Sequence, residues 1–195
     1  MERRQLTLGI LAGGEGRRLG GVDKAWAEFG GEPLVLRQCR RLGDVAARIL
    51  VSANRNLERY PEHGLAAVPD RLSGFQGPLA GIDALLSACR TPWLVTVPVD
   101  AWDVDGAILH ALLAACGDAA GAVAVEPGGP QPMLAAYAVR RCRGPVEWAL
   151  ADGERAVQRV QAALGFPTLV LERAIGNLNT PEAFARAQAG MAVRE

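Results

Sequence analysis

The stretch Leu11-Ala12-Gly13-Gly14-Glu15-Gly16-Arg17-Arg18-Leu19-Gly20-Gly21-Val22-Asp23-Lys24 is the most informative part of this sequence. It follows directly on the apolar run at residues 6–11, which predicts a buried first strand. Its closely spaced glycines let the backbone adopt positive φ and approach a ligand closely. Consecutive backbone N–H groups in such a turn form an anion-binding nest. The strand before it places the turn at the carboxyl edge of a sheet, where α/β proteins bind ligands.

Two cations of this loop suit a phosphorylated ligand. Arg18 offers a bidentate phosphate contact and Lys24 a mobile point charge, so together they can stabilise the charge on a leaving pyrophosphate. Two common glycine loops are excluded by spacing. A dinucleotide fingerprint needs a third glycine where Leu19 stands, and a Walker A loop needs Ser or Thr where Lys24 is followed by Ala25. The remaining alternative is a flexible strand–helix turn with solvated arginines.

Short β-rich runs alternate with longer helical patterns along the chain, which predicts helices packed on both faces of a mostly parallel sheet. The fold class expected is therefore a doubly wound, three-layer α/β/α Rossmann-like fold. Strands are predicted at residues 6–11, 48–52, 66–68, 93–97, 122–125, 133–139 and 168–171, and helices at residues 33–42, 78–89, 104–116, 145–150, 154–164 and 181–189. The glycine- and proline-rich residues 126–132 predict a mobile loop.

Composition limits the class of protein. The 195 residues are 50% hydrophobic and 22% charged, which suits one domain with a real core. Lys plus Arg and Asp plus Glu number 21 each, so nucleic acid is not an expected partner. The charged first residues lack a signal-peptide core and no apolar run is long enough to cross a membrane, so we expect a cytoplasmic protein. The four cysteines form no C-x-x-C pair and are expected to be buried free thiols: Cys39, Cys89, Cys116 and Cys142.

Asp100 stands at the end of the strand predicted over residues 93–97, after Pro98-Val99. Parallel strands bring this carboxylate to the edge where the glycine loop lies. Mg²⁺ is usually held by one or two carboxylates together with phosphate oxygens and water, so Asp100 is the predicted metal ligand. The alternative is that it only forms a turn. Asp103 is expected to cap the next helix, with Asp105 in its first turn.

Asn54 and Asp70 each follow a predicted strand and are candidates for nucleotide selection. Asn54 carries both a donor and an acceptor that can read a base or ribose edge, and Asp70 can accept hydrogen bonds from either. Both residue types are also common in turns, which is the alternative interpretation. Trp26 and Trp102 are candidates for stacking on a flat ring, whereas Trp93 and Trp148 are expected in the core.

The pattern L-A-G-G-x-G-x-R-L-G-G-x-D-K resembles the signature of the molybdenum cofactor guanylyltransferases, whose fold is that of the nucleotidyltransferases. The steps Asn54-Arg55, Gly77-Pro78-Leu79-Ala80-Gly81, Gly153-Glu154-Arg155 and Asn177-Leu178-Asn179-Thr180-Pro181-Glu182 are similar to the family as well. At Pro98-Val99-Asp100 a valine replaces the cysteine of the family's P-C-D step. The resemblance implies GTP contacts at Leu11, Ala12, Gly13, Gly14, Lys24, Asn54, Asp70 and Asp100. It implies one nucleotidyltransferase domain over residues 1–195, with a nucleotide-binding half at 1–105 and an acceptor-binding half at 106–195.

The activity implied is transfer of GMP from GTP to the terminal phosphate of molybdopterin, with Mg²⁺ as cofactor and release of pyrophosphate. Lys24, Arg18 and Asp100 are the implied catalytic residues, and Arg155 and Asn179 are candidates on the acceptor side. A molybdoenzyme or a cofactor-delivery protein is the expected receiving partner. Two alternatives stay open: a cytidylyltransferase or sugar-phosphate nucleotidyltransferase of the same fold, and a nucleotide-binding delivery module without catalysis.

Overall fold

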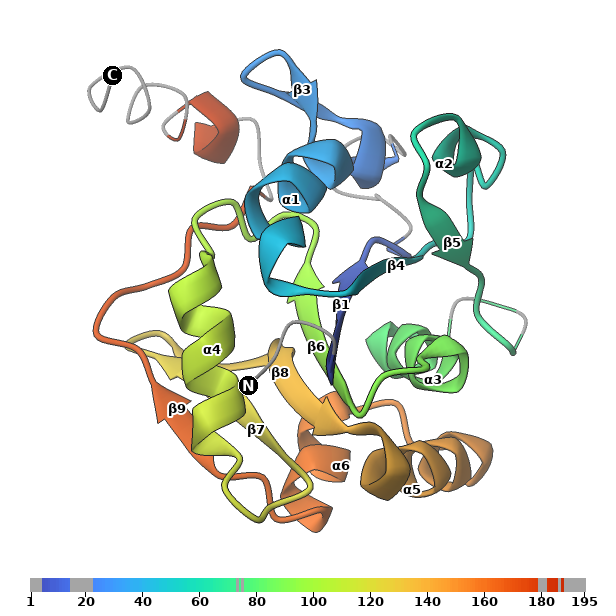
Figure 1. The fold of residues 1–195 in the computed structure, drawn as a ribbon, viewed down its shortest axis with the longest axis vertical. Helices are drawn as coiled ribbons and strands as arrows, with labels where there is room; N and C mark the ends of the chain where they lie inside the picture. Colours follow the sequence, from blue (N-terminus) through green and yellow to red (C-terminus); the bar gives the residue numbers. More distant parts are fainter. Residues whose placement is uncertain are drawn as a thin grey trace.

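A seven-stranded sheet forms the centre of the protein, with helices on both faces (Figure 1). The computed structural model describes residues 5–14, 23–72, 74, 76–178, 182–185 and 187. The strand order is β5-β4-β1-β6-β8-β7-β9. The strands are β1 (Leu6–Leu11), β4 (Arg48–Ser52), β5 (Ala66–Val68), β6 (Trp93–Pro98), β7 (Gly121–Glu126), β8 (Gly129–Ala138) and β9 (Thr168–Val170). A two-residue pair, β2 (Glu28–Phe29) and β3 (Glu32–Pro33), lies outside this sheet.

The sheet is mostly parallel, which confirms the predicted fold class. β8 is antiparallel to both of its neighbours, and the other pairings found between described strands of the sheet are parallel. The central strand β1 is buried along its whole length, as its run of apolar residues requires. Its register pairs Leu11 with Ser52 of β4 and with Pro98 of β6, so these three strands end at one level.

Two apolar clusters fill the space between the sheet and its helices. One lies under α1 (Leu34–Leu42) and α4 (Gly106–Ala115) and takes Leu6, Leu8 and Ile10 from β1. The other lies under α3 (Pro78–Ala88), α5 (Val139–Ala151) and α6 (Val157–Ala163). A short helix, α2 (Arg59–Glu62), connects β4 to β5. None of the helices in the described part of the chain is long and apolar enough to cross a membrane.

The prediction of a mobile loop at residues 126–132 is wrong. β7 and β8 form a hairpin that turns at Pro127 and Gly128, and residues 129–132 already belong to β8. The register shifts between Val123 and Ala124, so the strand accommodates an irregularity there. The amide of Gln131 donates to Glu126 at 2.6 Å across the hairpin. The glycine and proline residues therefore shape a tight turn and a bulge.

Two further expectations need correction. Asp105, and not Asp103, caps α4, because its side chain accepts a hydrogen bond from the Ile108 N–H at 3.0 Å. Trp148 is 70% exposed although it was expected in the core. Helix α5 begins at Val139, earlier than the predicted start at residue 145. Its buried residues are Val139, Cys142, Val146 and Leu150. This helical spacing leaves Trp148 off the buried face.

All four cysteines are free thiols, as expected, and three of them are buried while Cys39 is half-buried. Burial raises the pKa of Cys39 and of Cys116 to about 11, and that of Cys142 to about 12. Burial favours the uncharged form of a thiol, so these groups stay protonated and unreactive near neutral pH.

Gly121, the first residue of β7, offers a direct test of the sheet. A Cβ there would lie 2.2 Å from the Ala136 carbonyl oxygen and 2.3 Å from the Phe166 ring. We expect Gly121→Ala to lower the free energy of unfolding by about 1–3 kcal/mol in urea titrations, because backbone and ring must shift. Gly128→Ala is the matched control in the same hairpin, since its Cβ would meet only the Glu126 side chain at 3.4 Å. A change within about 0.5 kcal/mol is expected there.

Candidate functional site

A cavity of about 440 Å³ opens at the carboxyl ends of the parallel strands. It lies where Leu11, Ser52 and Pro98 end β1, β4 and β6 at one level. Its lining residues are Leu11, Ala12, Gly13, Gly14, Lys24, Ser52, Asp70, Gly77, Pro78, Gly81, Pro98, Val99, Asp100 and Met133. The structure thus brings together most of the residues that the sequence singled out for nucleotide binding. Arg18 lies outside the described residues.

Lys24 and Asp100 form an ion pair at the wall of this cavity. The Lys24 Nζ lies 2.5 Å from the Asp100 Oδ2, and the two side chains are 18% and 15% exposed. Lys24 opens the short 3₁₀ helix η3 (Lys24–Trp26), and Asp100 follows β6, so the pair joins segments 76 residues apart. The cavity wall therefore presents a cation and a carboxylate side by side, as a metal-bound phosphate ligand requires.

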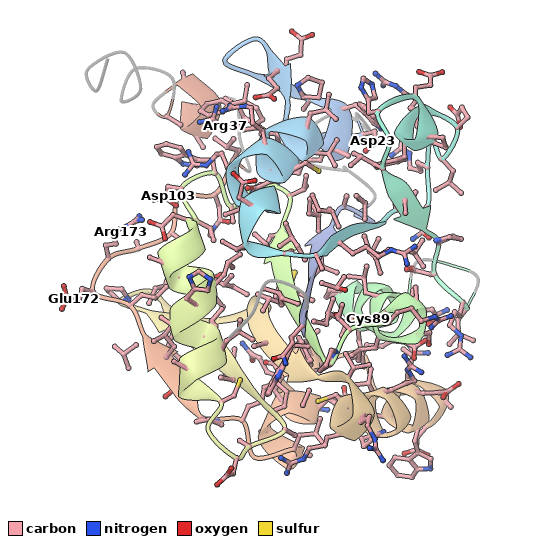
Figure 2. All side chains as sticks on the ribbon, viewed as in Figure 1. Asp23, Arg37, Cys89, Asp103, Glu172 and Arg173 are labelled. Atoms are coloured by element: carbon pink, nitrogen blue, oxygen red, sulfur yellow. The ribbon has the colours of Figure 1, made fainter. Side chains whose placement is uncertain are left out.

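Local contacts hold Lys24 in place. Asp23, labelled in Figure 2, caps η3 by accepting a hydrogen bond from the Ala25 N–H at 3.1 Å. Its other oxygen accepts from the Asn56 amide at 2.7 Å. Asn56 has a φ of 49°, a left-handed conformation that asparagine tolerates better than most residues. The loop after β4 thus fixes the residue that precedes Lys24.

Asn54 and Asp70 hold each other by two hydrogen bonds. The Asn54 amide donates to the Asp70 Oδ2 at 2.8 Å, and the Asp70 N–H donates to the Asn54 Oδ1 at 2.8 Å. The Asp70 Oδ1 is buried and has no hydrogen-bond partner among the described residues. Burial raises the pKa of Asp70, while the hydrogen bond from Asn54 opposes the rise. Asp70 therefore contributes a carboxylate to the cavity lining, and Asn54, which is not in the lining, orients it.

The glycine loop passes close to this pair, which explains one of its glycines. A Cβ at Gly13 would lie 3.3 Å from the Asn54 Nδ2 and 3.6 Å from the Ser52 hydroxyl. The contact with Asn54 is tighter than ordinary van der Waals contact, so a side chain at position 13 would require the Asn54 amide to shift by a few tenths of an ångström. The first residues of the glycine loop are therefore fitted to the end of β4 and to the segment after it, which carries Asn54.

The oxygen donors at the cavity fit a hard cation that is held mainly by the phosphate oxygens of a bound molecule. Asp100 supplies a carboxylate, and no group of three or more His, Cys, Asp or Glu residues that could hold a metal exists among the described residues. Mg²⁺ is commonly bound in this way, through one or two carboxylates, with phosphate oxygens and water completing the octahedron. The residues present therefore suit a magnesium–triphosphate complex better than a metal held by protein alone.

The structure places several of the candidate residues away from the cavity wall, and another candidate lies outside the described residues. Trp26 is buried under the Arg59 guanidinium, 4.0 Å from its ring, so it is not open to stack on a ligand. Trp102 packs on Phe29, with the ring centroids 5.9 Å apart. The Arg155 guanidinium donates to Gln76 at 2.8 Å and is not in the cavity wall. Asn179 is not among the described residues.

Sequence reasoning missed Ser52, which lines the cavity. Ser52 is the last residue of β4, and its strand-end position was a usable signal. Met133 also lines the cavity, from the irregular part of β8, and it belongs to the strand predicted over residues 133–139.

Comparison with known proteins supports the resemblance seen in the sequence. The family model for MobA-like NTP transferase domains matches residues 8–166. A molybdenum cofactor guanylyltransferase of Pseudomonas paraeruginosa is 38% identical over 181 residues, which is 91% of this chain and 91% of the relative. The protein of that name from Pseudomonas putida is 35% identical over 177 residues, which is 89% of this chain and 92% of the relative.

Solved structures share the fold at low sequence identity. The molybdopterin-guanine dinucleotide biosynthesis protein A of Archaeoglobus fulgidus has a TM-score of 0.78 at 21% identity, covering 96% of this chain and 99% of its own. The 2-C-methyl-D-erythritol 4-phosphate cytidylyltransferase of Thermus thermophilus has a TM-score of 0.72 at 18% identity, covering 94% and 98%. These likenesses bear on the architecture of the sheet and its helices alone.

The buried carboxylate of Asp70 makes a prediction about stability. Its pKa in the folded state is raised above the ordinary value of 3.8, so the folded protein binds more protons than the unfolded chain between those two values. The free energy of unfolding therefore falls as the pH rises through this interval. We expect Asp70→Asn to remove this penalty, giving a variant more stable than the parent at neutral pH, with a smaller gain in mild acid.

Urea titrations of both proteins at the two pH values measure this difference. Asp118→Asn is the matched control, because the Asp118 side chain is exposed and the same chemical change should leave stability unaltered at both pH values. A variant no more stable than the parent at neutral pH would show that the Asp70 carboxylate carries no desolvation penalty.

Proposed function

Because the chain belongs to the family of MobA-like NTP transferase domains, we propose that it transfers GMP from GTP to the terminal phosphate of molybdopterin, releasing pyrophosphate. The product would be molybdopterin guanine dinucleotide. The relatives that carry the name molybdenum cofactor guanylyltransferase cover nearly the whole chain, and this supports the choice of both substrates. The single structural observation that carries the proposal is the Lys24–Asp100 pair at the wall of the cavity.

The geometry suits an in-line displacement at the α-phosphorus of a nucleoside triphosphate. An oxygen of the acceptor's terminal phosphate forms the new P–O bond, while the bond to the bridging oxygen of the β-phosphate breaks and its electron pair leaves with pyrophosphate. The backbone N–H groups of the glycine loop and the Lys24 ammonium would bind the phosphate oxygens and stabilise the charge that develops on the leaving group. No covalent intermediate on the protein is needed.

Asp100 is the residue that would hold Mg²⁺ through its carboxylate. When bound, the ion would neutralise the negative charges of donor and acceptor phosphates that otherwise repel each other. The ion pair with Lys24 keeps this carboxylate at the cavity wall. Lys24 and Asp100 would then take up new partners, the ammonium on the triphosphate and the carboxylate on the cation.

Asn54 and Asp70 would face the nucleoside. Their mutual hydrogen bonds leave one oxygen of Asp70 without a hydrogen-bond partner among the described residues, so it could accept a hydrogen bond from a base or ribose. Guanine presents N–H donors at its Watson–Crick edge, and a fixed carboxylate oxygen is a suitable acceptor for them. A site with a buried acceptor rejects ligands that leave that acceptor unpaired.

The metal assignment is tested by Asp100→Asn, which keeps the size of the side chain and removes its charge. We expect at least about a hundredfold loss of turnover, measured as pyrophosphate release with GTP, Mg²⁺ and molybdopterin, because the cation loses its carboxylate ligand. Asp105→Asn makes the same change five residues along and should retain activity, since asparagine caps α4 as well as aspartate does. Undiminished pyrophosphate release from a folded Asp100→Asn variant would refute the assignment.

The donor and the acceptor are tested with the unmodified protein. In thermal-shift measurements with Mg²⁺, GTP is expected to raise the melting temperature more than CTP, UTP or ATP, because at equal concentration the ligand that binds the folded state more tightly stabilises it more. A preference for CTP would instead indicate a cytidylyltransferase.

Mass spectrometry of a mixture of the protein with GTP, Mg²⁺ and molybdopterin should show a guanylated pterin. Tight GTP binding without guanylated product or pyrophosphate would identify a delivery module without catalysis.

A further inference from the structure

Gln38 lies beneath the loop that carries Asp100, although it is not part of the cavity wall. It belongs to α1, is 2% exposed and points into the core between the helix and the sheet. Its amide nitrogen lies 2.8 Å from the Ala101 carbonyl oxygen, 3.3 Å from that of Pro98 and 3.4 Å from that of Val99. One buried amide therefore meets the carbonyls on both sides of Asp100.

The chemistry of these contacts fixes the orientation of the amide. Carbonyl oxygens only accept hydrogen bonds, so the group that faces them must be the NH₂ and not the amide oxygen. The two N–H groups of the amide are shared among three carbonyl oxygens, and the shortest contact is with the Ala101 carbonyl. Without this donor, carbonyls beside Asp100 would lose a buried hydrogen bond, and the loop would have to turn in order to satisfy them.

The opposite side of the same loop is held by main-chain hydrogen bonds. Residues 173–178, which we term the C-terminal strap, run from β9 to the loop after β6 (Figure 1). The Leu178 N–H donates to the Asp100 carbonyl at 3.1 Å, and the Trp102 N–H donates to the Gly176 carbonyl at 3.1 Å. Asp103 accepts from the Gly176 N–H at 2.8 Å. It also forms an ion pair with Arg173, and both residues are labelled in Figure 2. The backbone at Asp100 is thus held from outside by the strap and from inside by Gln38.

Helix α1 also relates Gln38 to Lys24. The helix follows η3 after the short β2–β3 hairpin, and the Leu34 N–H at its start donates to the Ala27 carbonyl at 3.0 Å. The first residue of α1 is therefore bonded to the segment that carries Lys24. One turn later, Gln38 of the same helix binds the loop that carries Asp100. Helix α1 is thus bonded to the segments that carry both Lys24 and Asp100, whose charged groups lie 2.5 Å apart.

We propose that Gln38 is a positioning residue that sets the Asp100 carboxylate where it shares a divalent cation with the triphosphate. This inference rests on the proposed role of Asp100. Residues that orient a metal ligand by hydrogen bonding to it, or to the backbone that carries it, commonly alter metal affinity without touching the metal. Gln38 should therefore control metal affinity, whereas binding of the nucleotide without metal should not depend on it.

The experiment compares Gln38→Met, which has a similar volume and no donor, with Gln38→Glu, which places an acceptor against three carbonyls. Free Mn²⁺ is followed by electron paramagnetic resonance while it is titrated into protein with a non-hydrolysable GTP analogue. We expect apparent Mn²⁺ affinity to fall roughly tenfold or more in both variants, as for other residues behind a metal ligand. Turnover should be reduced at limiting Mg²⁺ and largely recovered at saturating Mg²⁺, with metal-free affinity for the analogue unchanged.

Thr7→Val is the matched control for loss of a buried side-chain hydrogen bond. Thr7 is fully buried and its hydroxyl lies 2.7 Å from that of Thr91, at the amino end of β1 and away from the cavity. This variant should lose stability without a change in Mn²⁺ affinity. Circular dichroism melts identify which variants are folded, and Gln38→Met alone suffices if Gln38→Glu does not fold.

The outcomes separate the two proposals. Wild-type Mn²⁺ affinity in a folded Gln38→Met protein overturns the positioning role while leaving the role of Asp100 intact. A wild-type protein that binds no Mn²⁺ with the analogue present would overturn the proposed function itself.

Discussion

The parallel pairing of β1 with β6 sets the position of everything else in the site. Leu11 lies opposite Pro98 in this register, and the Val99 N–H continues the ladder to the Leu11 carbonyl at 3.0 Å. The glycine loop and the Asp100 loop therefore leave the sheet at the same level and diverge from one point. On the other side of β1, the Ala12 N–H bonds the Ser52 carbonyl at 2.9 Å, which brings the Asn54 loop to the same edge. A shift of one residue in either pairing would turn the side chains of that strand to the opposite face and separate the groups of the site.

The first half of the chain could be predicted from sequence because its elements are defined locally. The strands β1, β4 and β5 were predicted with the bounds that the structure has, since each is a short apolar run that ends at a glycine or a polar turn. Once these strands are parallel, their carboxyl ends must meet, and Lys24, Asp70 and Asp100 reach one cavity for that reason. Motif and topology therefore agree on the same residues.

The second half was harder because tertiary contacts define it. Proline and glycine at residues 126–132 suggested a loop, yet the same residues form a hairpin with a shifted register. That irregularity is supported from a distance: the Gln161 amide donates to the Pro132 carbonyl at 2.7 Å, and the Thr96 hydroxyl donates to the Met133 carbonyl at 2.8 Å. Neither partner is near the hairpin in sequence, so no local pattern could have predicted the irregular register of this strand. Gln38 could not be predicted for the same reason, because nothing in the pattern of an amphipathic helix indicates that its glutamine is buried.

The polar groups at the cavity contribute differently to the stability of the folded protein. Asp70 keeps a buried oxygen that has no hydrogen-bond partner in the described part of the chain, which destabilises the folded state. Lys24 and Asp100, by contrast, neutralise each other across the cavity wall, so each has a partner before a ligand arrives. The energetic consequences differ: a ligand that pairs with Asp70 relieves an existing penalty, whereas a ligand that engages Lys24 and Asp100 must first replace a favourable contact. Under the proposed function, the gain where a base pairs with Asp70 would help to offset the loss where the phosphates engage Lys24 and Asp100.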